Sequence, residues 1–96
     1  MAQWHLDELE NKIQQTGWII ISQLQEEEHK AIWVIKRKSI QYIDFSCFDT
    51  MGYPVPLQES FGCQIRETKV NLYFYKKGEN WKNNLSEFIS KLNNLD

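Results

Sequence analysis

The chain has 96 residues, a formal net charge of −2 and an apolar fraction of 42%. Its charged fraction of 25% is typical of globular proteins and excludes disorder as the main state. A pI of about 5.7 disfavours a nucleic-acid-binding domain, because such domains usually have a pI above about 9. The apolar runs are far shorter than the roughly 20 residues that cross a bilayer, so we expect no membrane span.

Length and cysteine content set further expectations. A chain of this size falls within the range of one domain, so we expect residues 1–96 to form a single domain. The first residues carry no basic segment followed by an apolar one, so we expect no secretory signal. Cys47 and Cys63 are then expected to be reduced thiols in a cytoplasmic protein.

The N-terminal segment has the periodicity of a helix. Leu6, Leu9 and Ile13 recur at spacings of three and four residues and share one face, which predicts a helix over residues 4–16. Gly17 follows and predicts the helix end, because glycine readily adopts the left-handed conformation found after many helices.

Three segments rich in β-branched and aromatic residues come next, each bounded by polar residues. They are residues 18–25, 31–38 and 40–48. Their composition predicts strands. The short connections predict an antiparallel meander, because parallel strands need a crossover of a dozen residues or more.

A loop separates these strands from the rest of the chain. Residues 49–62 contain two glycines and both prolines, which predicts a loop with a short helical turn at 56–60. Two further strands are predicted at 63–67 and 69–75, and the second of these alternates apolar and polar residues.

The clearest helical pattern covers residues 81–95, with Asn80 as the predicted N-cap. The predicted order is therefore helix, three strands, loop, two strands, helix. It predicts an α+β two-layer sandwich, with the N- and C-terminal helices packed on one face of an antiparallel sheet of about five strands. This order resembles that of small acidic secretion chaperones if the turn at 56–60 counts as a middle helix, and the resemblance implies a dimeric, partner-binding protein.

The face of the predicted sheet that points away from the helices is more apolar than a solvated face normally is. Alternation places Tyr42 of the third strand and Tyr73 and Tyr75 of the fifth on this outer face, and we assign Trp33 to it as well. Large exposed apolar patches usually mark interaction sites. We therefore expect the loop 49–62, a second copy of the chain or another protein to cover this face.

These observations favour a non-enzymatic protein-interaction module of an adaptor, regulatory or chaperone-like kind. Trp and Tyr dominate interface hot spots, so the predicted interaction surface is Trp33, Tyr42, Tyr73 and Tyr75. An edge strand is a second candidate surface. The predicted partner is another protein or a second copy of the chain in a homodimer.

A small-molecule-binding protein or an enzyme is the first alternative. Its pocket would lie between loop 49–62 and the sheet, with Asp44 and Cys63 as lining residues. Catalysis at a cysteine would need a nearby base, but His5 and His29 lie in no recognisable catalytic or metal-binding motif. We therefore expect no enzymatic activity, no cofactor and no metal site.

Weak binding of single-stranded nucleic acid is the second alternative. It would use the basic residues at 36–38 and 76–77 together with Lys82, and bases would stack on nearby tyrosines. These residues do not match the pattern of the common RNA-binding motif, and the low pI disfavours this function.

Overall fold

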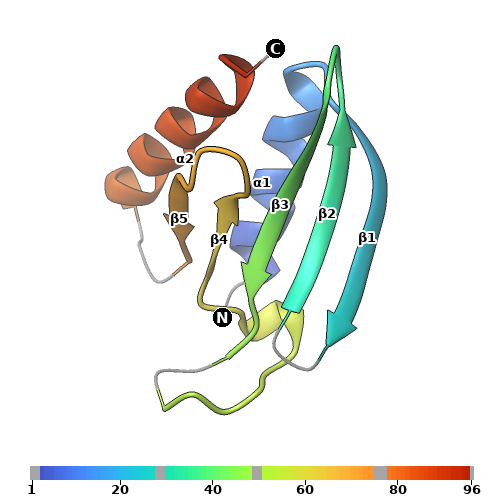
Figure 1. The fold of residues 1–96 in the computed structure, drawn as a ribbon. Coiled ribbons are helices and arrows are strands. Elements are labelled where there is room, and N and C mark those ends of the chain that lie inside the picture. Colours follow the sequence, from blue (N-terminus) through green and yellow to red (C-terminus); the bar gives the residue numbers. More distant parts are fainter. Residues whose placement is uncertain (1–2, 28–29, 49–50, 75–77, 96) are drawn as a thin grey trace.

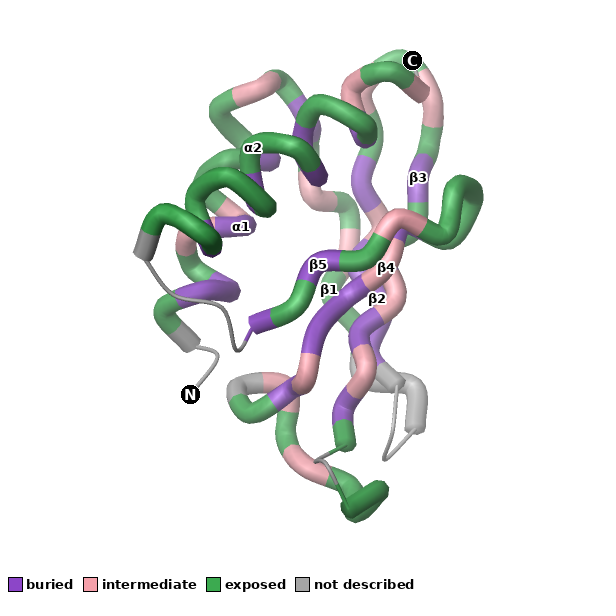
Figure 2. Tube along the Cα trace, turned by 90° about the vertical axis from the view of Figure 1, so that its left-hand side faces the viewer, coloured by how far each residue is buried: buried purple, intermediate pink, exposed green. Residues whose placement is uncertain are grey.

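The computed structural model describes residues 3–27, 30–48, 51–74 and 78–95. Its elements, in chain order, are α1 (Gln3–Gln15), β1 (Ile19–Glu27), β2 (Lys30–Lys36), β3 (Ile40–Ser46), the 3-10 helix η1 (Leu57–Glu59), β4 (Gly62–Ile65), β5 (Asn71–Tyr73) and α2 (Gly78–Asn93). The five strands form one antiparallel sheet in the order β1-β2-β3-β4-β5. Figures 1 and 2 show both helices on the same side of this sheet, which confirms the predicted α+β sandwich.

The end of α1 follows directly from its glycine. Gly17 has a φ of 97°, a left-handed conformation that suits glycine. The amide of Gly17 donates to the carbonyl of Gln14, and the amide of Trp18 donates to that of Ile13. These two bonds form a Schellman motif, which satisfies the last carbonyls of the helix and directs the chain into β1.

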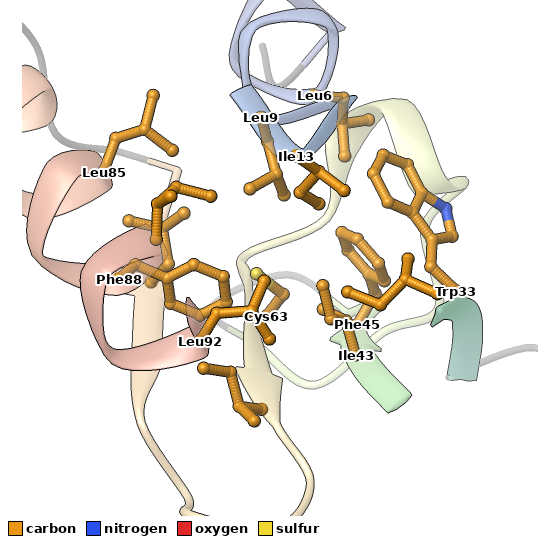
Figure 3. Packing of buried hydrophobic residues seen from close by; sticks show 14 of the residues in the cluster. Leu6, Leu9, Ile13, Trp33, Ile43, Phe45, Cys63, Leu85, Phe88 and Leu92 are labelled. Carbon is orange, nitrogen blue, oxygen red and sulfur yellow. The ribbon is translucent and has the colours of Figure 1, made fainter. Parts of the chain in front are cut away.

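The core lies between the sheet and the two helices (Figure 3). The helices contribute apolar residues at helical spacing, and the strands contribute alternate residues. The main contributors are Leu6, Leu9, Ile13, Trp81, Leu85, Phe88 and Leu92 from the helices and Trp33, Ile35, Ile43, Phe45, Cys63, Ile65 and Leu72 from the strands. Burial of each large apolar side chain contributes about 1.5–3 kcal/mol, so this face of the sheet dominates stability.

A close approach of two strands explains one glycine in β4. A Cβ atom on Gly62 would lie 2.6 Å from the carbonyl oxygen of Leu72 and 3.2 Å from the Cα of Tyr73. Real Cβ atoms do not approach so closely, so β5 can pack beside β4 at this point only because residue 62 has no side chain.

Arg37 joins the far ends of both helices to the β2–β3 turn. Its guanidinium donates to the carbonyl of Thr16 at 3.0 Å, and to the carbonyl and Oδ1 of Asn93 at 3.1 and 3.2 Å. The same group lies over the ring of Trp18, 4.9 Å from the ring centre, and the Trp18 indole also donates to Asn93. A cation at the C-terminal ends of two helices is favourable because it complements their dipoles.

The starts of two helical segments differ from the expectations drawn from sequence. α2 begins at Gly78, so Asn80 lies inside its first turn and is not the N-cap. η1 spans Leu57–Glu59, with Pro56 as its N-cap, so Pro56 precedes the turn that it was expected to begin.

Candidate interaction surface

The register of β1, β2 and β3 defines which side chains lie on the outer face, away from the helices. Ile35 of β2 and Ile43 of β3 are fully buried in the core. Because side chains alternate between the two faces along a strand, the residues directly before and after each of them on the same strand face outward. Cross-strand partners share a face, and the pairs are Ile19 with Lys36, Lys36 with Ile40, Val34 with Tyr42, and Leu24 with Ile32.

These pairs create an apolar region on one half of the outer face. We call it the apolar half. It comprises Ile19, Leu24, Ile32, Val34, Ile40 and Tyr42, and the polar residues Ser22 and Lys36 lie among them. Ile19 is 67% exposed, Leu24 54%, Ile40 49% and Tyr42 39%. Ile32 is mostly covered, yet it is not part of the helix-side core cluster. Side chains this large stay exposed in clusters mainly where a protein binds something.

A charged pair marks the inner boundary of the apolar half. Arg66 forms two hydrogen bonds with Asp44, from Nη2 to Oδ1 at 2.7 Å and from Nε to Oδ2 at 3.1 Å. Its guanidinium also lies over the Tyr42 ring, 4.6 Å from the ring centre. The bidentate geometry holds Arg66 flat on the sheet, so that Tyr42 presents only part of its ring to solvent.

The predicted interaction residues do not form one patch. Trp33 is the Cα partner of Ile43 and is 3% exposed, so it lies in the core and not on the outer face. Tyr42 and Tyr73 are both on the outer face but two strands apart, about 10 Å across the sheet and about 13 Å along it. Tyr73 instead packs edge-on against Phe61 and borders a hollow of about 350 Å³ between β5 and α2. Tyr75 lies outside the described residues.

The loop does not cover the apolar half. Its described part, residues 51–61, extends past the end of β3 (Figure 1), where Phe48 bridges to Pro54. η1 packs against α1, on the opposite side of the sheet. Met51 and Tyr53 are 76% and 63% exposed. Of the three predicted covers, the structure therefore does not support the loop.

The two proposed pocket residues lie on opposite faces of the sheet. Cys63 is the Cα partner of Phe45 and is buried in the core, whereas Asp44 pairs with Gln64 and faces outward. One pocket therefore cannot be lined by both. Burial raises the pKa of the Cys63 thiol well above its ordinary value, which leaves this cysteine protonated and poorly nucleophilic at neutral pH.

The basic residues also lie apart. Lys36 and Lys38 are exposed near the β2–β3 turn, while Arg37 between them is bound to carbonyl groups of the helix ends. Lys82 lies near the start of α2, about 16 Å along the helix axis from Asn93 beside Arg37. Residues 76–77 lie outside the described residues.

The edges of the sheet are poorly suited to binding. β1 has register irregularities between Ile20 and Ser22 and between Gln25 and Glu27, and β5 is only three residues long. Irregular and short edge strands discourage the addition of a further strand. The outer face is therefore the stronger candidate surface.

The sequence interpretation missed the aliphatic part of this surface. Ile19, Leu24 and Ile40 are more exposed than Tyr42 and Tyr73, but the prediction named aromatic residues alone. The register of the β2–β3 hairpin contains the information needed to assign side chains to the two faces. A tight turn centred on Lys38 pairs Ile40 with Lys36 and Ile43 with Trp33, which separates the two faces.

Within the part of the chain that the structure describes, no three His, Cys, Asp or Glu side chains gather as a metal ion would require. Among these residues no helix is long and apolar enough to cross a membrane. Comparisons with protein-family models, with curated proteins and with solved structures found no match to this chain.

Proposed function

We propose that this chain is a non-enzymatic protein-interaction module whose binding surface is the apolar half of the outer sheet face. The observation that carries the proposal is the exposure of four large apolar residues, Ile19 and Leu24 on β1 and Ile40 and Tyr42 on β3, the two strands that flank β2. Burial of such side chains by a partner would release free energy that the isolated chain does not gain. The covering surface belongs to another protein or to a second copy.

The setting that we propose is the reducing cytoplasm. Cys47 and Cys63 are both free and buried, and neither forms a disulfide. Such buried thiols act as small apolar packing residues, so their presence fits a compartment that keeps thiols reduced.

Site-specific photo-crosslinking in cells of the source organism tests this function. A photoreactive amino acid at Ile40 should give discrete adducts, while the same group at Asn83, exposed on α2, should give none. Adding Ile19→Asp to the Ile40 probe should abolish the adducts, because an unpaired carboxylate would then be buried in the interface. Equal labelling from Ile40 and Asn83, or no adduct from Ile40, would contradict the proposal.

A further inference from the structure

A hollow with an apolar floor and a polar rim lies beside the free edge of β5, next to α2 (Figure 1). It measures about 350 Å³, and its lining comes from β5 with the residue before it and from α2: Val70, Asn71, Leu72, Tyr73, Asn84, Glu87, Phe88 and Lys91. Leu72 and Phe88 are each only 1% exposed, so they form the apolar floor. Small-ligand sites usually combine such an apolar surface with a few polar groups that fix the orientation of the ligand.

The backbone of β5 adds a donor and an acceptor to the rim of this hollow. The amide of Ile65 donates to the carbonyl of its register partner Val70 at 2.9 Å. Bonded and non-bonded pairs alternate along an antiparallel ladder, so the next pair, Gln64 with Asn71, exchanges no such bonds. The N–H and C=O groups of Asn71 therefore point away from β4, toward the free edge of the sheet.

Two side-chain amides and one ion pair complete the rim. Within the part of the chain that the structure describes, the side-chain amides of Asn71 and Asn84 have no hydrogen-bond partner. The Nζ of Lys91 lies 3.2 Å from the Oε1 of Glu87, which leaves the second carboxylate oxygen and two ammonium N–H groups for other partners. The rim thus offers both donors and acceptors, and its two charges cancel.

We propose that this hollow binds a small neutral molecule with several hydroxyl groups on a ring, a monosaccharide or a cyclic polyol. Each hydroxyl group both donates and accepts, so neighbouring hydroxyls match the amides and the two charged groups of the rim. The C–H groups of such a ring form an apolar face that fits the floor of Leu72 and Phe88. A charged ligand is disfavoured, because Glu87 and Lys91 already neutralise each other.

This site is separate from the apolar half. The apolar half lies on β1–β3, whereas β5 is the strand at the opposite edge of the sheet. The inference therefore goes beyond the proposed function, and neither requires the other. The exposed rim predicts weak binding, because water competes for its hydrogen bonds, and we expect a dissociation constant of about 1–10 mM.

NMR titration of the ¹⁵N-labelled chain with D-glucose, D-galactose and myo-inositol, each up to about 100 mM, tests the inference. At least one of the three should give saturable shifts of the side-chain amide signals of Asn71 and Asn84. The backbone amide signal of Ile40, on the outer face of β3, should not move. The affinity should change by less than about twofold between about 50 and 500 mM NaCl, because the ligand carries no charge.

Two neighbouring asparagines on α2 provide matched variants. Asn84→Ala should raise the dissociation constant about three- to tenfold, because the Asn84 side chain lines the hollow. Asn83→Ala should leave it unchanged, because Asn83 is equally an exposed residue of α2 but is not among the lining residues. Circular dichroism of both variants confirms that they are folded before their affinities are compared. Equal effects of the two substitutions, no saturable shift with any of the three probes, or tighter binding of phosphate or acetate at these residues would overturn the inference.

Discussion

On the helix-covered face of the sheet, Ile43 and Phe45 of β3 are 0% and 2% exposed, whereas Ile40 and Tyr42 of the same strand are 49% and 39% exposed on the outer face. One strand thus carries large apolar residues on both faces, and only one face uses them for folding. Antiparallel sheets with one solvated face normally place polar residues there. This difference between the two faces is the observation on which the proposed role of the outer face in association rests.

Alanine substitutions of isoleucine on the two faces of β3 test whether only the helix-covered face stabilises the folded chain. Ile43→Ala should lower the free energy of unfolding by about 2–5 kcal/mol, because it removes a fully buried side chain and leaves a cavity. Ile40→Ala, three residues earlier in β3, should change it by less than about 1 kcal/mol in the monomer. Urea unfolding at low micromolar concentration measures both values. Equal losses would show that the outer face also belongs to the folded core.

The arrangement of helices and strands follows from local patterns. Leu6, Leu9 and Ile13 share one helical face whatever the rest of the chain does, and Gly17 ends that helix through its own backbone preference. The short polar connections between strands leave an antiparallel meander as the simplest topology. These features depend on residues close in sequence, so sequence alone predicted the fold class and the element order.

The assignment of faces depends on contacts that alternation does not reveal. β2 lies inside the sheet, and both Ile32 and Trp33 are nearly covered although they lie on opposite faces. Composition therefore could not place Trp33. In β1 the irregularity between Ile20 and Ser22 shifts the alternation, so that Ile19 and Ser22 both pair with outer-face residues of β2. The strand register, and not the composition of each strand, separates the core from the candidate surface.

Arg37 offers a second comparison, between a basic residue that holds the fold together and its basic neighbour on the outer face. Arg37→Ala should destabilise the chain by about 1–3 kcal/mol, because the carbonyls of Thr16 and Asn93 lose a charged donor. Lys36→Ala should cost less than about 0.5 kcal/mol, since Lys36 is an exposed residue. Arg37→Lys should not restore stability, because an ammonium group cannot reproduce the planar set of donors. Thermal unfolding of the three variants would contradict this role if Arg37→Ala and Lys36→Ala behaved alike.

The pH dependence of stability at Cys63 shows whether solvent reaches the core on the helix-covered face. Burial raises the pKa of its thiol in the folded chain well above the ordinary value, so the folded state holds this proton more tightly than the unfolded state does. The contribution to stability is complete below the unfolded pKa, near 8.5, and is lost as pH rises toward the folded pKa. The free energy of unfolding should therefore fall above about pH 8.5, by at most about 1.4 kcal/mol per pH unit for this group.

The control for this pH dependence is Cys63→Ala, which keeps all other titrating groups. Its free energy of unfolding should fall less steeply between about pH 8.5 and 10 than that of the original chain, whatever its value at pH 7. Parallel curves for the two chains would show that Cys63 ionises equally well in the folded and unfolded states. In that case the core beneath β4 is open to solvent.

The smallest expected effect on stability comes from the ion pair of Asp44 and Arg66 on the outer face. Asp44 and Arg66 have side-chain exposures of 36% and 45%, so their attraction is screened by water and salt. Asp44→Asn should cost about 0.2–1 kcal/mol in the monomer, and the cost should shrink as salt is added. A double-mutant cycle with Arg66→Gln isolates the coupling of the two side chains. A coupling near 3 kcal/mol that salt did not reduce would be the behaviour of a buried pair. It would mean that the outer face is already covered under the conditions of the measurement. Repeating the cycle over a range of protein concentrations then distinguishes an open face from a closed one.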